Sequence, residues 1–470
     1  MIRKTKIIAT IGPATASKEM LRKIIQRGVN VCRLNLSHLS HEKAKEVIAL
    51  IKEVNQELHV HTAILADLQG PKIRVGEFAK PLKLKKGAEI VFCTKKRKQS
   101  IYINYPNFAK DVSVNDRVLI DDGKLALSVI ATNKKDTVKL KVIFGGKLLS
   151  NKGVNLPNTK ISLPCLTKKD KKDLTFILNE KVEWIGLSFV RSANDIKTLK
   201  KIIKIQKQHH KVIAKIEKPE AIKEIDAIIK EADAIMVARG DLGFEVPPQK
   251  VPVNQKMIVE KCISSSRPVV IATQMLESMT ASPIATRAEV NDVANSVIDG
   301  ADAVMLSGET SIGKYPHKAV DTMRKIIKDV ERSEHSISKN RLPALVKNKG
   351  RLVSNTICSN ACIVAEQIKA QAIITITYSG YNTIKTSSFR PTAFIYAFTN
   401  NHTILNTLSL VWGVVGFYYD RGATTDQTII ETQGILKKGR FIKKGDFVVN
   451  LASMPANEKG TTNMMKISKA

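Results

Sequence analysis

The chain has little of several residue types and patterns that mark specialised proteins. Its six cysteines, at positions 32, 93, 165, 262, 358 and 362 of 470, form no Cys-x-x-Cys pair and no zinc-like spacing with histidine. The segment IIATIG near the N-terminus is too short for a secretion signal, and LVWGVVGFYY (410–419) would cover about half of a bilayer. We therefore expect a cytoplasmic protein with reduced thiols and no membrane association.

Acidic and aromatic residues are also scarce. Asp and Glu number 43 against 76 Lys and Arg, which gives a net charge of +33, and aromatic residues make up 5% of the chain. Such a balance favours anionic partners, either nucleic acid or small phosphorylated and carboxylated metabolites. The lysines are dispersed, and no RNA-binding or helix-turn-helix signature accompanies them. Dispersed lysine is typical of a solvated surface, so we expect no nucleic-acid partner.

Eight short, apolar, β-rich runs alternate with segments that have a helical pattern. In the segments 17–28, 193–206 and 219–232, apolar residues recur at spacings of three and four with charges between them. Near-continuous apolar strands that alternate with amphipathic helices predict a parallel sheet covered by helices, and eight such units predict an α/β fold of the TIM (β/α)8 barrel type. The eight runs are TKIIATIGP, VNVCRLNLSH, TAILADLQG, VEWIGLSFV, KVIAKIE, ADAIMVARGD, RPVVIATQM and ADAVMLSGET.

Two further regions interrupt or follow this pattern. From about residue 75 to 166 the segments alternate polar and apolar residues instead, and Asp122-Gly123 is a turn signal. This predicts a small all-β domain inserted in a βα loop on the active-site side of the barrel. After the eighth unit, a polar stretch precedes another series of strand and helix patterns. The predicted organisation is a barrel domain over 1–74 and 167–335, the inserted lid over 75–166, a linker over 336–350, and a C-terminal three-layer α/β domain over 351–470.

Polar residues gather at the predicted carboxyl ends of the barrel strands, where barrel enzymes place their chemistry. Glu217 and Asp241 end neighbouring strands and suit a hard divalent ion such as Mg²⁺. Lys215 lies two residues before Glu217 and so shares its face of the strand. With Arg33 and Arg74, Lys215 offers fixed positive charge for a phosphate. The strand-end residues in chain order are Arg33, Asn35, Ser37, Asp67, Ser188, Lys215, Glu217, Asp241, Thr273 and Glu309.

Each of these residues also has a purely structural interpretation. Lys215 and Glu217 could form a solvated ion pair of little energetic value. Asp241 could be a helix N-cap, Arg33 a strand-end ion pair, and Thr273 a hydroxyl satisfied within the core. Their joint position at one barrel mouth favours a Mg²⁺-dependent enzyme that acts on a small phosphorylated or carboxylated anion.

These residues and the stretches around them closely resemble the pyruvate kinase family. The resemblance runs in order from residue 5 to near the C-terminus and so covers the whole chain. It implies a barrel with a small β-barrel lid and a C-terminal α/β regulatory domain. It also implies transfer of the phosphoryl group of phosphoenolpyruvate to ADP, giving pyruvate and ATP. The matching stretches are TKIIATIGPA, CRLNLSH, ADLQGPKIR, KGVNLP, IAKIEKPEA, MVARGDLG, IATQMLESM, TRAEVNDVANSVIDGADAVMLSGET and GTTNMMKI.

The resemblance implies a role for each strand-end residue. Glu217 and Asp241 would hold Mg²⁺ or Mn²⁺. Lys215 would stabilise the transferring phosphoryl group and the departing enolate oxygen, because a fixed ammonium favours a metaphosphate-like transition state. Thr273 would lie near C3 of the enolate, where either its hydroxyl or a water supplies a proton. The substrate contacts would be Arg33, Ser188, Gly240, Asp241 and Thr273, and the nucleotide contacts Asn35, Arg74 and Lys169.

A monovalent-cation site is implied as well, together with an unusual residue beside it. Family members that need K⁺ hold it with residues corresponding to Asn35, Ser37, Asp67 and the backbone of Leu68. Those members usually carry a glutamate where this chain has Lys72. A lysine ammonium can supply the positive charge that K⁺ would bring, so we expect K⁺ not to be required. The alternative is that Lys72 only reflects the general lysine excess.

The C-terminal loop 378–383 departs from the family's effector cradle. The sequence YSGYNT keeps only part of the Ser, Thr and Gly pattern, and Tyr381 is bulky. By resemblance we expect a homotetramer and an effector site for a sugar phosphate or nucleoside monophosphate at a helix N-terminus. The residues expected at this site are Ser379, Gly380 and Thr383.

Two alternatives from other functional classes stay open. A Mg²⁺-dependent aldolase that acts on pyruvate-like acids could share the paired carboxylates, but it would lack the inserted lid and the C-terminal domain. A catalytically silent basic binding protein would be expected to lose Lys215, Glu217 or Asp241, and all three are present.

Overall fold

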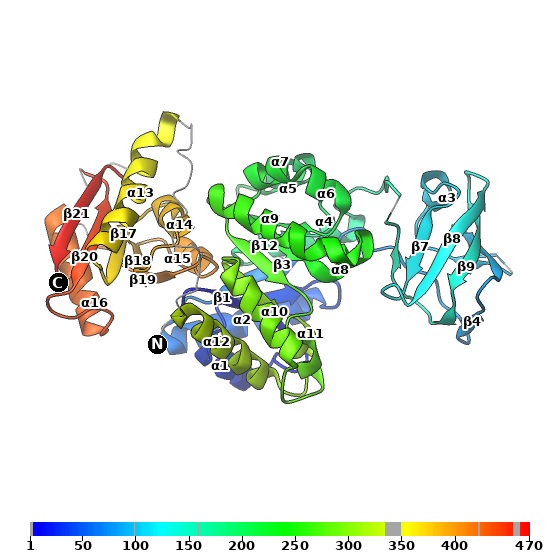
Figure 1. The fold of residues 1–470 in the computed structure, drawn as a ribbon, viewed down its shortest axis with the longest axis horizontal. Coiled ribbons are helices and arrows are strands. Elements are labelled where there is room, and N and C mark those ends of the chain that lie inside the picture. Colours follow the sequence, from blue (N-terminus) through cyan, green and yellow to red (C-terminus); the bar gives the residue numbers. More distant parts are fainter. Residues whose placement is uncertain (1–2, 98, 158, 334–348, 422–423, 455–460) are drawn as a thin grey trace.

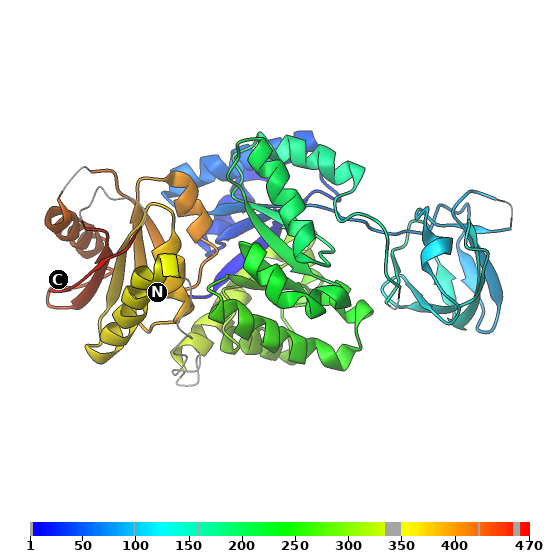
Figure 2. The ribbon, with the colours of Figure 1, turned by 90° about the horizontal axis from the view of Figure 1, so that it is seen from above.

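Three bodies lie along the long axis of the molecule in the computed structural model, which describes residues 3–97, 99–157, 159–333, 349–421, 424–454 and 461–470. A barrel occupies the centre, a β-rich domain one end and an α/β domain the other (Figures 1 and 2). The predicted linker at 336–350 falls almost wholly outside the described residues. The predicted domain boundaries stay predictions.

Eight parallel strands form the closed central barrel. Each of these strands pairs with the barrel strand that follows it in the sequence. The last of them pairs with the first, with Ala303 opposite Lys6. This closure confirms the predicted TIM barrel fold. The strands are β1 (Lys6–Ile11), β2 (Val31–Asn35), β3 (Ala63–Asp67), β12 (Trp184–Leu187), β13 (Lys211–Ile216), β14 (Ala234–Ala238), β15 (Val269–Ala272) and β16 (Ala303–Leu306).

Amphipathic helices cover the outside of the barrel. In α1 (Lys18–Gln26), Leu21, Ile24 and Ile25 are buried, as their spacing of three and four predicts, and the Ser17 side chain caps the first turn. The pattern at 219–232 forms two helices instead of one, because the backbone at Glu224 (φ −95°, ψ 14°) leaves the helical range. The other covering helices are α2 (His41–Leu58), α4 (Lys168–Leu178), α5 (Ala193–Ile205), α6 (Pro219–Lys223), α7 (Ile225–Glu231), α9 (Val251–Ser264), α10 (Arg287–Ile298) and α12 (Pro316–Arg332).

Shorter helices follow strands at the barrel mouth. Helix α8 (Arg239–Glu245) begins directly after β14, and the 3-10 helix η1 (Pro248–Lys250) leads into α9. The 3-10 helix η2 (Glu277–Thr280) and helix α11 (Gly308–Ser311) follow β15 and β16.

The interior of the barrel changes from apolar to charged along its axis. On β13, Ile213 lies in the interior apolar cluster, and the residues two and four positions on are Lys215 and Glu217. Because alternate residues of a strand share a face, the same inward face carries the apolar floor and the charged mouth. Leu410 of the C-terminal domain completes the floor and is fully buried there. The cluster comprises Ile8, Val31, Ala63, Leu65, Trp184, Ile213, Ala234, Met236, Val270, Ala272, Ala303, Met305 and Leu410.

The inserted domain is formed mainly of antiparallel sheet, as predicted. A six-stranded sheet runs in the order β11-β7-β8-β9-β5-β6, and β10 pairs with β4. The predicted Asp122-Gly123 turn joins β7 to β8, with both residues at positive φ. One short helix, α3 (Phe108–Asp111), was not predicted. The strands are β4 (Leu82–Leu84), β5 (Glu89–Cys93), β6 (Ile101–Tyr102), β7 (Arg117–Ile120), β8 (Leu125–Thr132), β9 (Thr137–Phe144), β10 (Gly146–Leu148) and β11 (Val154–Asn155).

The C-terminal domain has three layers, with helices on both faces of a five-stranded sheet in the order β19-β18-β17-β20-β21. Ile373 and Val449 point toward α13, whereas Ile374 and Phe398 share a cluster with Leu436 of α16. The last strand, β21, pairs antiparallel with β20. The elements are η3 (Lys349–Arg351), α13 (Leu352–Gln367), β17 (Ala372–Ile376), α14 (Tyr381–Ser388), β18 (Phe394–Thr399), α15 (His402–Leu408), β19 (Val414–Tyr418), α16 (Thr425–Lys438), β20 (Phe447–Ala452) and β21 (Met464–Lys469).

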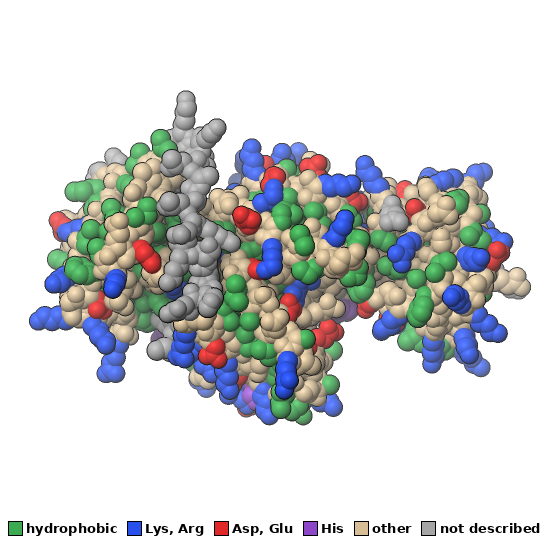
Figure 3. Space-filling model, viewed as in Figure 1, with side chains coloured by type: hydrophobic (Ala, Val, Ile, Leu, Met, Phe, Trp, Pro, Cys, Tyr) green, Lys and Arg blue, Asp and Glu red, His purple; other side chains and the backbone are tan. Residues whose placement is uncertain are grey.

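Basic side chains are spread over the surface of the molecule, whereas the cysteine thiols are buried. On the face shown in Figure 3, Lys and Arg are spread over all three domains and do not form one patch. All six cysteines are free and buried. Within the described residues, no helix is both long and apolar enough to cross a membrane.

Candidate active site

Asp67 is the centre of a buried charge cluster at the barrel mouth. Strands β2, β3 and β13 direct Arg33, Asp67 and Lys215 into the barrel. The Arg33 guanidinium binds Asp67 Oδ2 through Nη2 at 2.6 Å and Nε at 2.8 Å, and Lys215 Nζ lies 3.3 Å from the same oxygen. Burial would raise the pKa of Asp67, but Lys215 and Arg33 together hold it below its usual value. The ionised Asp67 carboxylate therefore holds two cations at one point of the barrel mouth.

Lys215 is held as a protonated ammonium. Its Nζ donates to Ser188 Oγ at 2.7 Å and lies 3.0 Å from Glu217 Oε1. Burial would lower the pKa of Lys215, but Asp67 and Glu217 outweigh it, and the pKa is raised. Ser188 in turn donates to the carbonyl oxygen of Leu68 at 2.7 Å. This network fixes the direction in which the ammonium points.

Glu217 and Asp241 form the pair of carboxylates predicted to hold a metal. Glu217 is 1% exposed, and its Oε2 accepts a hydrogen bond from the Phe189 backbone N–H at 2.7 Å. The pKa of Glu217 is raised, mainly by burial. The charge of Lys215 lowers this pKa, whereas the negative charge of Asp241 raises it. Glu217 Oε1 has the Lys215 ammonium 3.0 Å away but accepts no hydrogen bond, so it keeps capacity to bind a metal ion.

This donor set fits a magnesium-like ion. Mg²⁺ commonly takes one or two carboxylates and completes its shell with substrate oxygens and water. In the described part of the chain, no group of three or more His, Cys, Asp or Glu side chains is arranged to hold a metal ion, so this site offers two carboxylates. Asp241 is not the N-cap of α8, because Ala238 occupies that position. The N-cap interpretation of Asp241 is therefore wrong, and its carboxylate is available as a ligand.

Thr273 adopts a backbone conformation that is uncommon for a β-branched residue. Its φ is 68°, which is in the left-handed region. Residues other than glycine that are held in this region by their surroundings are concentrated at functional sites. The Thr273 hydroxyl donates to the Ala272 carbonyl at 2.6 Å and accepts from the Gly240 N–H at 2.7 Å. A Cβ at Gly240 would lie 3.3 Å from Thr273 Oγ1, so glycine allows this close approach. The guanidinium of Arg239 also holds the loop, donating to the Thr273 carbonyl at 2.8 Å.

Several cations surround His38, a residue of the RLNLSH stretch for which the sequence alone predicted no role. Burial lowers the pKa of His38, and Lys72, Arg74, Arg33 and Lys169 lower it further. The neutral imidazole therefore lies in a strongly positive field, which attracts phosphate. Lys169 also donates to the Leu36 carbonyl at 2.6 Å, and Arg74 donates to the Asn151 carbonyl of the inserted domain at 2.8 Å.

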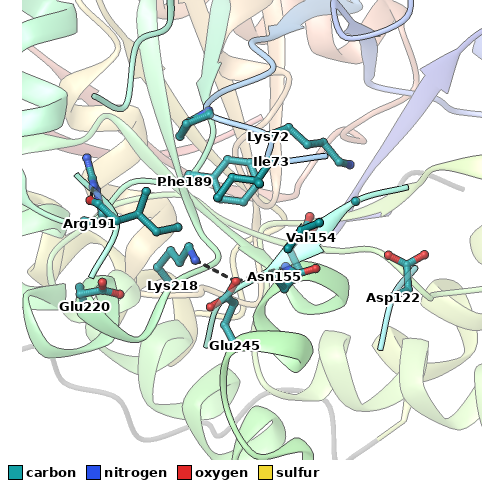
Figure 4. Close-up of a pocket in the computed structure, with 14 residues that line it drawn as sticks. Lys72, Ile73, Asp122, Val154, Asn155, Phe189, Arg191, Lys218, Glu220 and Glu245 are labelled. Atoms are coloured by element: carbon teal, nitrogen blue, oxygen red, sulfur yellow. Dashed lines mark hydrogen bonds and ion pairs between the residues drawn. The ribbon is translucent and has the colours of Figure 1, made fainter. Parts of the chain in front are cut away.

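A cleft lies between the inserted domain and the barrel mouth. Figure 4 shows Asp122, Val154 and Asn155 approaching it from the inserted domain. Lys218 and Glu245 line the opposite side and form an ion pair. Of the predicted site residues, Asp241 and Lys72 line the cleft. Sequence reasoning missed Lys218 and Glu245, although Lys218 lies within the matching stretch IAKIEKPEA.

The residues of the predicted monovalent-cation site already have partners. Asn35 Oδ1 accepts from the Ser37 N–H at 3.1 Å, and the Leu68 carbonyl accepts from Ser188. Asp67 binds both Arg33 and Lys215. Among the described residues, the Lys72 side chain makes no hydrogen bond or ion pair, and it is exposed.

The predicted effector residues do not face one surface. Ser379 is exposed, and Gly380 occupies the N-cap position of α14. Thr383 is fully buried, and its hydroxyl lies 2.8 Å from that of Thr375 on β17. The side chain of Thr383 therefore points into the domain.

Comparisons with known proteins cover nearly the whole chain. The family model described as pyruvate kinase, barrel domain, matches residues 2–320, and the one described as pyruvate kinase, alpha/beta domain, matches residues 355–468. Pyruvate kinase 2 of Synechocystis sp. is 42% identical over 99% of this chain and 79% of the relative. The pyruvate kinase of Clostridium acetobutylicum is 39% identical over 99% of both chains. A crystal structure of a pyruvate kinase from Cryptosporidium parvum superimposes with a TM-score of 0.91 at 34% identity, covering 99% of this chain and 96% of that one.

Proposed function

The chain belongs to the pyruvate kinase family, and from that membership we propose how its barrel mouth performs the family's reaction. This is transfer of the phosphoryl group of phosphoenolpyruvate to ADP, which gives pyruvate and ATP in glycolysis. The observation that carries our assignment of the site is the buried cluster of Arg33, Asp67, Lys215 and Glu217 beside Asp241.

Arg33 and Lys215 bind and stabilise the transferring group. Arg33 is fixed by hydrogen bonds to Asp67 and, through Nη1, to Thr10 Oγ1 at 3.0 Å, so the N–H groups left over meet the substrate phosphate in a set orientation. Lys215 stabilises the charge that develops on the phosphoryl group and the enolate oxygen, because a preorganised ammonium needs no reorientation during reaction. Asn35, Arg74 and Lys169, with His38 between them, receive the phosphates of ADP.

Glu217 and Asp241 are the residues that would hold Mg²⁺ or Mn²⁺. When bound, the ion supplies a Lewis acid that neutralises charge on substrate oxygens. Thr273, with its backbone enforced at φ 68°, presents its hydroxyl near Gly240, where the substrate carboxylate and the enolate carbon lie. Ser188 orients Lys215 through its 2.7 Å hydrogen bond.

Two measurements test these assignments. A coupled assay should show ADP-dependent formation of pyruvate from phosphoenolpyruvate in the presence of Mg²⁺. The substitution Asp241→Ala should weaken binding of Mn²⁺ and of phosphoenolpyruvate together, measured by titration. An unchanged metal titration in a folded Asp241→Ala variant would remove Asp241 from the site.

We propose that this enzyme does not require K⁺, although pyruvate kinases generally use it. Lys72 is exposed and contributes to the positive field at His38, near the loop that carries Asn35 and Ser37. Its ammonium can supply the monovalent charge that K⁺ brings elsewhere.

The test compares activity in K⁺-free and Na⁺-free buffer with activity in KCl, with tetramethylammonium holding ionic strength constant. We expect similar rates for the unmodified enzyme and K⁺ dependence in Lys72→Glu. Strong activation of the unmodified enzyme by KCl would contradict the proposal.

We also propose a cytoplasmic homotetramer whose C-terminal domain binds a sugar phosphate or nucleoside monophosphate near Ser379 and Gly380. The inward direction of Thr383 limits the hydroxyls available there, so we expect a weak response. Substrate saturation measured with a panel of such phosphates tests this, and no response to any of them would refute the effector site.

A further inference from the structure

Lys218 and Glu245 form a buried ion pair directly beside the two metal-binding carboxylates. Lys218 Nζ lies 2.8 Å from Glu245 Oε1, and the two side chains are 6% and 1% exposed (Figure 4). Lys218 follows Glu217 in the chain, and Glu245 lies on the same short helix as Asp241, one turn later. The pair therefore connects the segment that carries one carboxylate to the segment that carries the other.

Neither charge is favoured by its own helix. Lys218 is the N-cap of α6, where the helix dipole disfavours a cation, and Glu245 ends α8, where it disfavours an anion. Burying two charges is also costly unless they bind each other closely. Local structure thus gives no reason for these residue types at these positions, whereas their attraction across two elements does.

Helix α8 is restrained at both ends and by Leu242, which is fully buried in the barrel core. It has no side-chain N-cap, and its N-terminal end is held by the Arg239 and Gly240 contacts to Thr273. The Lys218–Glu245 pair holds the other end. Asp241 lies between these two anchors, so the pair limits how far the helix backbone that carries its carboxylate can move away from Glu217.

The inserted domain contacts the same oxygen. Asn155 Nδ2 of β11 donates to Glu245 Oε1 at 3.2 Å, whereas Glu245 Oε2 is buried without a hydrogen-bond partner. Removing Lys218 would leave a buried carboxylate with only this one amide contact, and the end of α8 would be free to reorganise.

We propose that the buried Lys218–Glu245 ion pair positions Glu217 and Asp241 relative to each other and so sets the divalent-cation affinity of the barrel mouth. This inference rests on the proposed assignment of Glu217 and Asp241 as the metal ligands. In this proposal Lys218 and Glu245 are positioning residues, since they act on the metal through the two carboxylates.

The experiment measures Mn²⁺ binding without substrate, from the EPR signal of free Mn²⁺, for Lys218→Met, Glu245→Gln and the double variant. We expect each single variant to bind Mn²⁺ about tenfold more weakly, the usual effect of losing a partner that orients metal ligands. The double variant should bind Mn²⁺ about as weakly as either single variant, because the two side chains act as a unit. Lys218→Arg should restore part of the affinity. The KM for phosphoenolpyruvate should rise more than kcat falls.

Three control variants separate the positioning role from a general loss of stability and from the lid contact. Arg390→Met breaks a buried ion pair with Asp302, whose side chains are 3% and 4% exposed, far from the mouth, and it should leave Mn²⁺ affinity unchanged. Asn155→Ala removes the lid contact alone and should also leave it unchanged. Asp241→Ala removes a proposed ligand and should weaken Mn²⁺ binding more than Lys218→Met does.

The outcomes distinguish the metal-site assignment from the positioning role. If Asp241→Ala binds Mn²⁺ normally, the assignment of the metal site is wrong. If Asp241→Ala loses binding while folded Lys218→Met keeps it, the positioning role alone is wrong. Equal weakening in Asn155→Ala or Arg390→Met would likewise overturn it. If the single variants do not fold, the double variant is measured instead, because it leaves no buried charge unpaired. Weakened Mn²⁺ binding by the double variant would support the positioning role, and normal Mn²⁺ binding would overturn it.

Discussion

Asp67 shows how single residues set the charge of the site. One fully buried carboxylate binds both Arg33 and Lys215, so a single residue fixes the positions of two cations. A solvated pair would hold its partners loosely and contribute little. Burial at the floor of the mouth makes these contacts strong enough to fix two side chains against an incoming phosphate.

The substitution Lys215→Met tests this arrangement at the residue scale. We expect kcat to fall by about 10²–10³, as for the loss of one transition-state donor, with smaller changes in substrate and metal binding. Steady-state kinetics and a Mn²⁺ titration measure both. The matched control is Lys6→Met, the same change in a buried lysine at the opposite end of the barrel. A near-normal kcat in Lys215→Met would contradict the assigned role.

At the scale of elements, the spacing of polar residues in the strands made part of the site predictable. Lys215 and Glu217 alternate on one strand face, so their shared direction follows from the sequence alone. The Lys218–Glu245 pair could not be predicted in this way, because it depends on how α8 turns after β14. The burial of Thr383 against β17 and the break between α6 and α7 likewise depend on packing and not on a local pattern.

The inserted domain is joined to the barrel by two extended segments (Figure 2). Arg191 of the barrel clamps the returning segment, donating to the carbonyls of Ile161 and, at 2.8 Å, Leu163. Across the cleft, the described contacts include the Asn155–Glu245 hydrogen bond. A domain held mainly at its connections can rotate as a unit.

We predict that the inserted domain closes over bound nucleotide and excludes water. Small-angle X-ray scattering should show a smaller radius of gyration with phosphoenolpyruvate analogue, ADP and Mg²⁺ together than with Mg²⁺ alone. The cleft between lid and mouth narrows in such a motion. An unchanged scattering curve with all three ligands present would argue against closure.

At the scale of the whole molecule, the C-terminal domain closes the floor of the barrel. Leu410 joins the interior apolar cluster, and Lys6 of β1 donates to the Val414 carbonyl at 2.6 Å. Arg390 binds Asp302 across the same interface. Burial, helped by Arg3, lowers the pKa of Lys6 from 10.5 to about 7 despite the opposing charges of Glu331 and Asp302.

This buried lysine predicts a pH dependence of stability. Below pH 7 Lys6 is charged in both the folded and the unfolded chain, and the cost of burying the charge is fully present. As the pH rises from about 7 to 10.5, the folded state loses this proton first, so the contribution of Lys6 becomes less unfavourable by up to about 1.4 kcal/mol per pH unit. Stability relative to Lys6→Met should therefore rise with pH.

Thermal unfolding midpoints of the unmodified chain and Lys6→Met, compared across this pH range, check the prediction. The control is Lys86→Met, which makes the same change at a lysine that is exposed on the inserted domain. A difference for Lys6→Met that is constant with pH would show that Lys6 keeps an ordinary pKa in the folded chain.

The burial of all six thiols gives the molecule a built-in set of labels for local opening. Cys93 lies in the inserted domain, Cys358 and Cys362 in the C-terminal domain, and the other three in the barrel. Burial raises the pKa of Cys32 to about 12 and that of Cys358 to about 11, so neither reacts readily as a thiolate while folded. A thiol reagent added in rising denaturant should modify each cysteine only when its surroundings open. Mass spectrometry of the modified peptides would then give the order in which the three domains unfold, without introducing a single probe residue.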